Sequence, residues 1–371
     1  MIPLVDLKAQ YDSIKPEIDA AIQRVLDHTQ FIEGPEVAAF EAAFANACGA
    51  PHAVGVASGT AAIDLALRVL GIGPGDEVIT TPHTFIATVE PVRDVGATPV
   101  FVDIDLGTYN IDPGKIEDAI TEHTRALMPV HLYGQPADML PILDIARRHD
   151  LRVIEDAAQA HGATYHDQHV GLWGDIGTFS FYPAKNIGAY GDAGAIVTRD
   201  AALAKRLRML RNHGRTEKYV HAMHGLGERL DALQAAILAV KLTRLEAWTT
   251  RRRQIADIYR VQLNDLPLIL PQELDGASHV YHQFVIRTER RDALRAHLRD
   301  AGVGTGIHYP LPLHLQPALE DLGYQEGDFP VTEQVADTVL SLPVYPELTS
   351  GQIDAIVSAI RGFYADGGIS G

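Results

Sequence analysis

The chain has one cysteine, Cys48, among its 371 residues. No intrachain disulfide can form, which favours a reducing compartment such as the cytoplasm. Long apolar runs are missing as well. No stretch approaches the roughly 18 apolar residues of a membrane-spanning helix, and Asp6 and Lys8 interrupt the segment where a signal peptide would be apolar. We therefore expect a cytoplasmic protein without a membrane partner.

Basic residues are in short supply. The chain has 31 lysine and arginine residues against 48 aspartate and glutamate residues, and its net charge is −17. Because a duplex-binding surface needs a basic stripe, no nucleic-acid partner is expected. A small anionic ligand remains compatible with this charge, since a few arginines are enough to line a pocket.

Histidine is plentiful, with 17 residues, but it does not predict a metal site. The pairs His166–His169 and His221–His224 are close enough in the chain to raise the question. No cysteine or carboxylate completes either pair at the spacing of a zinc site. We therefore expect no metal.

The sequence does contain a regular alternation of short apolar strands and amphipathic helices up to about residue 245. This alternation predicts an α/β fold with a mostly parallel mixed sheet. Shorter strand and helix signals follow and predict a smaller α+β domain. We place a large domain at 1–245, with its first helix free to pack elsewhere, and a small domain at 246–371.

Among the helices predicted from apolar residues at helical spacing, three stretches matter for the description of the fold. They cover Asp6–His28, Gly114–His123 and Arg229–Leu263.

One lysine stands out because its surroundings are apolar. Lys185 is the only charged residue between Phe179 and Gly191. A lysine at a surface turn is the ordinary explanation. A partly desolvated lysine would instead have a lowered pKa and act as a nucleophile toward carbonyl groups. A companion feature must decide between the two.

Asp156 is that companion. It ends an apolar strand, and the carboxyl ends of parallel strands face the ligand crevice of an α/β sheet. Pyridoxal phosphate (PLP) needs a lysine for its aldehyde and an aspartate for its pyridine nitrogen. A strand-end aspartate often only caps a helix. Together, Lys185 and Asp156 favour a PLP site.

A possible phosphate site precedes them in the chain. A helix that starts at Gly59-Thr60, after the strand Ala53–Ala57, would point backbone N–H groups at the crevice. The alternative is an ordinary helix cap by Ser58 or Thr60.

With these features, the chain resembles the DegT/DnrJ/EryC1/StrS aminotransferases, which are fold-type I PLP enzymes that aminate keto sugars. The resemblance runs in order through nearly the whole chain. It implies a homodimer with active sites shared between subunits. It is carried by "VASGTAAIDLAL", "TPHTFIAT", "MPVHLYGQPADM", "VIEDAAQAHGA", "TFSFYPAKNIGAYGDAGAIVT" and "RLDALQAA".

The resemblance implies roles for residues of the cofactor site. Lys185 matches the lysine that carries PLP, and Asp156 matches the partner of the pyridine nitrogen. Gln159 matches a residue beside the ring hydroxyl. Phe85 matches the aromatic that stacks on the ring, although an aromatic residue is more often core. The residues that match the phosphate contacts are Gly59, Thr60 and Ser180.

The segment around Lys185 and the proline-rich "GIHYPLPLHLQPA" look like the nucleotide-sugar 3-aminotransferase branch. The implied reaction moves an amino group from L-glutamate to C3 of a nucleotide-linked 3-keto-deoxyhexose. Tyr182, His308 and His314 would contact the sugar, or else pack the domain boundary. The alternatives are a nucleotide-sugar 4-aminotransferase, a cyclitol aminotransferase and a regulatory protein with this fold.

One position departs from the family. The family usually reads G-x-N-x-R before its long helix, and that asparagine reaches the cofactor phosphate of the partner subunit. Here Gly227 stands at its place. Either Asn212 or Arg229 substitutes for it, or the contact is missing. Arg229 is expected to meet the anionic cofactor or substrate of the other subunit, on a segment, Arg211–Asp231, that crosses between them. A solvated loop is the alternative.

Overall fold

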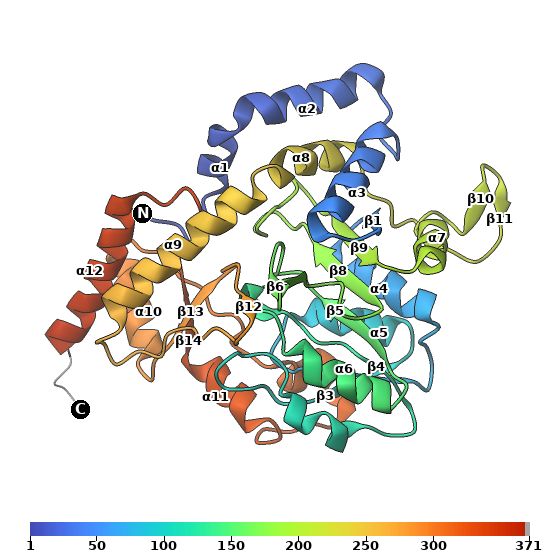
Figure 1. Cartoon of the computed structure of the whole chain (residues 1–371). Helices are drawn as coiled ribbons and strands as arrows, with labels where there is room; N and C mark the ends of the chain where they lie inside the picture. The colour runs from blue at the N-terminus through green and yellow to red at the C-terminus, as the bar shows by residue number, and fades with distance from the viewer. Residues whose placement is uncertain (368–371) are drawn as a thin grey trace.

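A seven-stranded mixed sheet forms the centre of the computed structural model, which describes residues 1–367 (Figure 1). The strand order is β1-β9-β8-β5-β4-β2-β3. All neighbours pair in parallel except β9, which runs antiparallel to both β1 and β8. The predicted mostly parallel sheet is confirmed. The strands are β1 His52–Val56, β2 Glu77–Thr80, β3 Thr98–Phe101, β4 Thr124–Leu127, β5 Arg152–Asp156, β8 Ile176–Ser180 and β9 Gly194–Thr198.

Helices cover both faces of this sheet, which is why its inner strands are continuous apolar runs. Successive side chains of a strand point to opposite faces. Ile154 therefore packs with the helices of one face, and Val153 packs with a helix of the other. The first face carries α4 (Gly59–Leu70), α5 (Glu90–Asp94) and α7 (Ala201–Leu210). The second carries α3 (Pro35–Cys48), α6 (Met139–Arg148) and α8 (Ala232–Leu242).

The prediction of one continuous helix over Asp6–His28 is wrong. The chain forms α1 (Leu7–Ser13) and α2 (Lys15–His28), with a break at Ile14. Pro16 falls in the first turn of α2, where its missing N–H costs no helical hydrogen bond. The proline thus starts a second helix instead of continuing the first, and α2 lies across α8 (Figure 1).

Two other helical predictions also need correction. The stretch Arg229–Leu263 is two helices, α8 and α9 (Leu245–Leu263), interrupted at Thr243 and Arg244. The stretch Gly114–His123 holds only the 3₁₀ turns η2 (Pro113–Lys115) and η3 (Glu117–Ala119). Ile120 there is extended, with φ −76° and ψ 130°, so the backbone leaves the helical region before a longer helix can form.

The C-terminal part of the chain builds a separate hydrophobic cluster, with Tyr259 and Phe284 among its buried members. One segment returns to the large sheet, because Leu313 and Phe329 pack against Phe101 of β3. The boundary at residue 245 remains a prediction, and 368–371 lie outside the described residues. The elements of this part are α10 (Arg291–Asp300), α11 (Pro330–Thr338), α12 (Ser350–Gly367), β13 (Phe284–Arg287), β14 (Val339–Leu342), η5 (Leu313–Leu315) and η6 (Pro317–Leu322).

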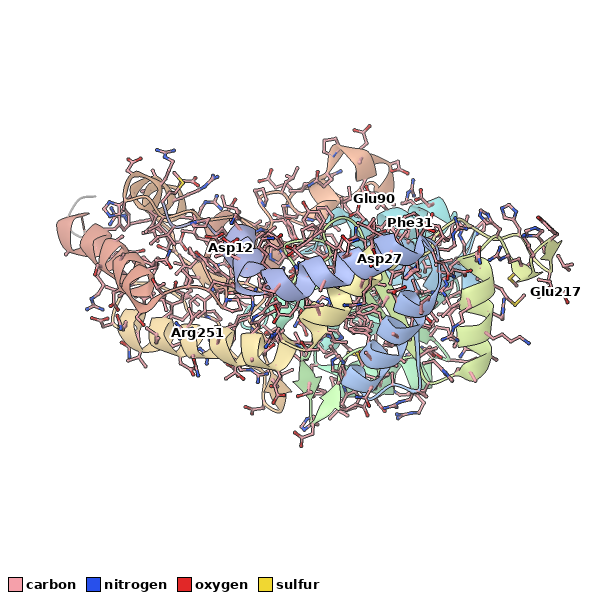
Figure 2. All side chains as sticks on the ribbon, turned by 90° about the horizontal axis from the view of Figure 1, so that it is seen from above. Asp12, Asp27, Phe31, Glu90, Glu217 and Arg251 are labelled. Atoms are coloured by element: carbon pink, nitrogen blue, oxygen red, sulfur yellow. The ribbon has the colours of Figure 1, made fainter. Side chains whose placement is uncertain are left out.

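A small hairpin, β10 (Arg215–Glu217) with β11 (Val220–His221), projects from the body of the molecule (Figure 1). Seen from above, Glu217 marks its far end (Figure 2). None of the helices within residues 1–367 is long and apolar enough to cross a membrane. The remaining short elements are β6 (Thr164–Tyr165), β7 (Gln168–His169), β12 (Ala277–Ser278), η1 (Ile86–Thr88) and η4 (Leu132–Gly134).

Candidate active site

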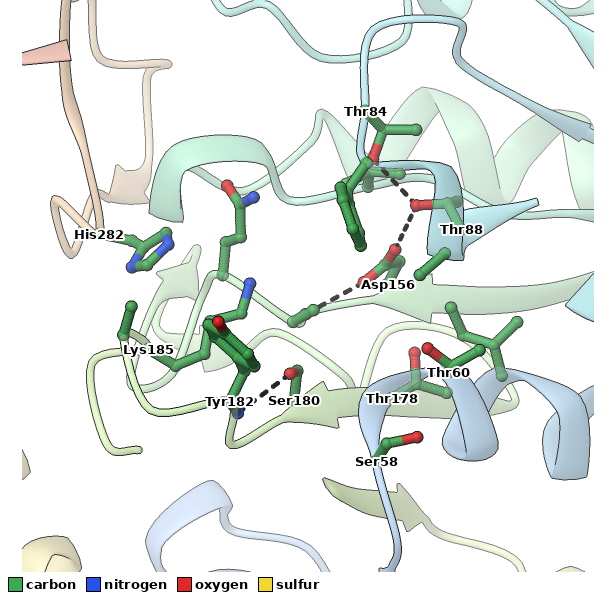
Figure 3. Close-up of a pocket in the computed structure, with 18 of the residues that line it drawn as sticks. Ser58, Thr60, Thr84, Thr88, Asp156, Thr178, Ser180, Tyr182, Lys185 and His282 are labelled. Atoms are coloured by element: carbon green, nitrogen blue, oxygen red, sulfur yellow. Dashed lines mark hydrogen bonds between the residues drawn. The ribbon is translucent and has the colours of Figure 1, made fainter. Parts of the chain in front are cut away.

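A cavity of about 450 Å³ opens at the carboxyl ends of β5 and β8, beside the N-terminus of α4 (Figure 3). This is the place where α/β sheets bind ligands. Nine of the predicted site residues line it: Gly59, Thr60, Phe85, Asp156, Gln159, Ser180, Tyr182, Lys185 and His308. Two predicted residues, Arg229 and His314, do not.

Lys185 stands in the turn after β8, where its backbone N–H donates to Tyr182 O (2.8 Å). Its side chain is half-buried and lines the cavity. Burial lowers the pKa of the Lys185 amine from 10.5 to about 8, and the carboxylate of Asp156 opposes this shift. A part of the amine is therefore neutral near neutral pH. A neutral amine in a cavity can attack a carbonyl carbon.

Asp156 is buried and held by two hydrogen bonds. Its Oδ2 accepts from the Thr88 hydroxyl (2.8 Å), and its Oδ1 accepts from the backbone N–H of Ala158 (3.1 Å). Thr88 is itself bonded to Thr84 (2.9 Å; Figure 3). Within residues 1–367, the element that follows β5 is the short strand β6 and not an α-helix, so the Asp156 carboxylate is not a helix cap. Its remaining lone pairs are available to a ligand in the cavity.

Glu155, the neighbouring carboxylate, has a different function because it points to the other face of β5. It is fully buried and accepts from the backbone N–H groups of Gly171, Trp173 and Gly174 at 2.7–2.8 Å. It is also bonded to His131 (2.9 Å). Glu155 therefore anchors the 171–174 loop, and only Asp156 faces the cavity.

The N-terminus of α4 combines a cap with an anion-binding shape. Ser58 caps the helix, since its Oγ accepts from Ala61 N (3.0 Å). A Cβ on Gly59 would lie 2.7 Å from Ser180 Cβ, so only glycine lets the helix approach β8 so closely. The first N–H groups of a helix lack helical partners and attract anions. Together with the hydroxyls of Thr60 and Ser180, this cradle fits a phosphate group.

Gln159 connects two distant parts of the chain at the cavity wall. Its Oε1 accepts from Tyr133 N (2.7 Å), and its Nε2 donates to the Tyr309 hydroxyl (3.1 Å). The Tyr309 ring lies 5.9 Å from the ring of Phe85. Phe85 is 54% exposed, which excludes a core position. An aromatic ring can therefore reach a flat ligand in the cavity.

His308 brings the C-terminal part of the chain into the site. Its Nδ1 is bonded to Ser341 Oγ (2.8 Å), and its carbonyl oxygen accepts from the Tyr133 hydroxyl. Burial and the positive charge of Lys185 lower the pKa of His308 to about 4. Its imidazole is therefore neutral at physiological pH. Tyr182, 57% exposed, stands at the cavity edge (Figure 3).

The two residues outside the cavity have other partners. His314 is buried against Phe329, and its Nε2 is bonded to Glu333 Oε1 (2.9 Å), so this chain's own cavity does not include it. Arg229 donates to Asn212 Oδ1 (3.1 Å). Asn212 stands directly opposite Gly227 in a β-bridge, and its Nδ2 donates to Glu33 (2.9 Å).

Sequence reasoning missed several residues of the cavity wall: Thr84, Thr88, Thr178, His282, Gln283 and Tyr309. Thr84 and Thr88 lie in the quoted segment "TPHTFIAT", and Tyr309 directly follows His308. Their positions beside recognised motifs could therefore have identified these three residues as part of the site.

Within residues 1–367, no three histidine, cysteine or acidic side chains gather in a group that could hold a metal ion.

Comparison with known proteins identifies the family of this chain. Residues 12–361 match the family model of the DegT/DnrJ/EryC1/StrS aminotransferases. The chain is 50% identical to a dTDP-3-amino-3,4,6-trideoxy-alpha-D-glucose transaminase of Streptomyces venezuelae, over 97% of this chain and 95% of the relative. It is 49% identical to a pleiotropic regulatory protein of Geobacillus stearothermophilus, over 98% of both chains.

Solved structures show the same fold. The crystal structure of S. venezuelae DesV in complex with a ketimine intermediate superimposes with a TM-score of 0.96, 49% identity and 98% coverage of both chains. The NtdA structure from Bacillus subtilis with bound cofactor PMP gives a TM-score of 0.91 and 35% identity, over 97% of this chain and 84% of that one. The chain therefore belongs to the DegT/DnrJ/EryC1/StrS aminotransferase family, with the fold-type I architecture and the PLP dependence of its enzymes.

Proposed function

We propose that this protein transfers an amino group from L-glutamate to C3 of a nucleotide-linked ketosugar, with PLP as cofactor. The observation that carries the proposal is the half-buried Lys185, with a pKa of about 8, in one cavity with Asp156. The identity of about half the residues to a nucleotide-sugar 3-transaminase supports the substrate class and the position of amination.

The residues of the cavity divide the catalytic tasks. When bound, PLP supplies an aldehyde that takes up an amine and a ring that accepts electrons from the neighbouring carbon. Lys185 would hold the aldehyde carbon and would be the group that moves a proton beside it. Asp156 would keep a proton on the ring nitrogen. Gln159 and Phe85 would hold the ring, and Gly59, Thr60 and Ser180 would bind the phosphate.

Tyr182 and His308 would bind the sugar. Both line the cavity on the side of Lys185. A neutral imidazole both donates and accepts hydrogen bonds, as sugar hydroxyls require. His314 would act on the sugar only if the segment that carries it moved, because its ring is bonded to Glu333 outside the cavity.

The test is a pair of half-reactions with the purified protein. L-glutamate should abolish the visible absorbance of the lysine-bound cofactor and release 2-oxoglutarate. A panel of nucleotide-linked 3- and 4-ketosugars should then restore this absorbance, with an amine at C3 in the NMR spectrum of the product. Amination at C4 would favour the 4-aminotransferase alternative, and amination of a cyclitol ketone would favour a cyclitol aminotransferase.

A regulatory protein with this fold is the second candidate, because one relative of 49% identity bears a regulatory name. A regulator has no need of a nucleophilic lysine, however. If L-glutamate left the cofactor absorbance unchanged and no amino sugar formed, the regulatory function would be preferred.

We further propose a cytoplasmic homodimer in which each active site takes residues from both subunits. The projecting hairpin exposes Tyr219 (80%) and Val220 (53%). Phe31 and Ile32, which follow α2, are also exposed. Exposed apolar side chains on such segments are typical of subunit contacts. Arg229 is only half-buried, so part of its side chain stays accessible to an anion of the other subunit.

A further inference from the structure

The cavity contains a histidine to which the proposed function assigns no role. His282 lies between β12 and β13 and lines the cavity at the same end as Lys185 (Figure 3). Its Nδ1 is 3.2 Å from Oδ1 of Asn186, the residue after Lys185. A segment nearly a hundred residues away in the chain is therefore bonded directly to the turn that carries the lysine.

Asn186 determines which nitrogen of His282 carries the proton. The amide Nδ2 of Asn186 donates to Val280 O (3.4 Å), which turns its Oδ1 toward the imidazole. An oxygen at that place accepts, so Nδ1 of His282 is the nitrogen that donates. In the neutral ring the other nitrogen, Nε2, is then an acceptor. Nε2 has no hydrogen-bond partner within residues 1–367.

Burial keeps His282 neutral, and nearby cationic groups act in the same direction. Burial lowers the pKa of His282 well below 6.5, and repulsion from Lys185, Arg252, His161 and His308 lowers it further. Nε2 therefore remains an acceptor throughout the physiological pH range.

We propose that His282 is a substrate-binding residue, whose Nε2 accepts a hydrogen bond from a sugar hydroxyl held beside Lys185; this inference rests on the proposed function. Lys185 and His282 both line the cavity and make no hydrogen bond with each other, so a ligand group in the cavity can contact both the amine and the imidazole. A hydroxyl can accept from the amine and donate to the imidazole at the same time.

The same argument makes His282 selective for one of the two half-reactions. Once the amine of L-glutamate has reacted, the rest of that substrate carries only carboxylate oxygens, which accept hydrogen bonds and cannot use an acceptor at Nε2. A sugar offers hydroxyl donors next to the carbon that is aminated. His282 should therefore matter more for the sugar than for glutamate.

The experiment measures the two half-reactions separately in the holoenzyme. L-glutamate is one amino donor. The other is dTDP-3-amino-3,4,6-trideoxy-α-D-glucose, with which the sugar half-reaction is measured in the reverse direction. We expect His282→Leu to lower kcat/KM for the amino sugar about five- to tenfold more than for L-glutamate, as for one lost hydrogen bond. His282→Gln, which keeps an acceptor oxygen near that position, should recover part of the loss. The exposed His123→Leu is the matched control and should change neither rate.

Each other outcome has one meaning. Equal losses for both donors, or no loss, would overturn the role of His282 and leave the proposed function intact. A wild-type enzyme that fails with L-glutamate would overturn the proposed function itself. A wild type that reacts with L-glutamate but not with the amino sugar would refute the sugar assignment, and the role of His282 with it.

A second variant tests the proton on Nδ1. In Asn186→Asp, a carboxylate beside Nδ1–H favours the charged imidazole and raises the pKa of His282. Nε2 then carries a proton and stops accepting. The acidic limb of the pH profile should move to higher pH, and further for the amino sugar than for L-glutamate. Because glutamine does not titrate, this extra movement should vanish in the Asn186→Asp, His282→Gln double variant. Its persistence there would contradict the proposal.

Discussion

Two lysines of this chain show that burial alone does not make a lysine reactive. Burial lowers the pKa of both Lys185 and Lys241 to about 8. The amine of Lys241 is nevertheless held by Gln10 Oε1 (2.8 Å) and Gly188 O (2.6 Å). Lys185 faces a cavity and has no such partner within residues 1–367. An amine without a hydrogen-bond partner, beside open space, therefore distinguishes the proposed nucleophile from the structural lysine.

The pKa of Lys185 predicts how the apoenzyme takes up PLP. Only the neutral amine attacks the aldehyde. The folded pKa is lowered to about 8, so the neutral fraction rises as the pH rises through 8 and levels off above it. The rate at which the visible cofactor band forms in stopped flow should follow that curve. A rate still rising tenfold per pH unit beyond pH 9 would show an unshifted lysine. Lys185→Ala should form no band that borohydride reduces.

Lys241 gives a prediction about stability. It is fully buried and joins α8 to α1 and to the turn after Lys185. Lys241→Met keeps the aliphatic volume but leaves two acceptors unpaired, and it should lower the free energy of unfolding by about 2 kcal/mol or more. Urea denaturation of wild type and variant measures this difference. Lys205→Met, on the exposed side of α7, is the control. An equal midpoint for Lys241→Met and wild type would contradict the prediction.

At the scale of elements, sequence patterns predicted the features that a short segment of the chain determines by itself. The sheet strands were predictable because buried parallel strands are short apolar runs. The break at Ile14 was not predicted, because the periodicity of apolar residues continues across it while Pro16 starts a new helix. The 3₁₀ turns at 113–119 share helical spacing with real helices over too few residues for the pattern to distinguish them.

The residues of the site also fall into those that the local sequence predicts and those that it does not. Lys185 and Asp156 were predictable because strand ends and apolar surroundings can be read in one short segment. Tyr309 and His282 reach the cavity from the C-terminal part, and their contacts with Gln159 and Asn186 span 150 and 96 residues. Spacing carries no information about such contacts. His314 lies outside the cavity because its segment packs on the large sheet through Phe329.

The approach of α4 to β8 is an element-scale prediction. A methyl group on Gly59 would meet Ser180 Cβ at 2.7 Å and Cα at 3.2 Å, so the start of α4 must move away from the strand. Gly59→Ala should weaken PLP binding about tenfold or more, because helix N–H groups and hydroxyls hold phosphate only at short range. Titration of the apoenzyme with PLP measures this affinity. Gly351→Ala, in α12 with nothing within 4 Å, is the control. Unchanged affinity in Gly59→Ala would exclude a phosphate at this helix end.

At the scale of the whole molecule, the exposed residues at the cavity edge favour the proposed dimer. Phe85 and Tyr182 at its edge are more than half exposed. The arginine that should meet an anionic ligand, Arg229, lies outside it. The hairpin with Tyr219 reaches away from the molecule (Figures 1 and 2). A second copy of the chain that covers the cavity and supplies Arg229 would complete the site.

Mixing two inactive variants tests this shared site. In a dimer of Lys185→Ala with Arg229→Ala, one site receives both altered residues and the other receives both intact ones. Random reassociation should therefore restore about one quarter of the wild-type activity, since half of the dimers are mixed and each has one intact site. The matched control mixes Lys185→Ala with Asp156→Ala. These two residues line the cavity of the same chain, so each site of that mixed dimer lacks one of them and activity stays absent. Native mass spectrometry verifies that mixed dimers form. If they form and the first pair remains as inactive as the control, Arg229 acts within its own chain or not at all, and the sites are not shared through it.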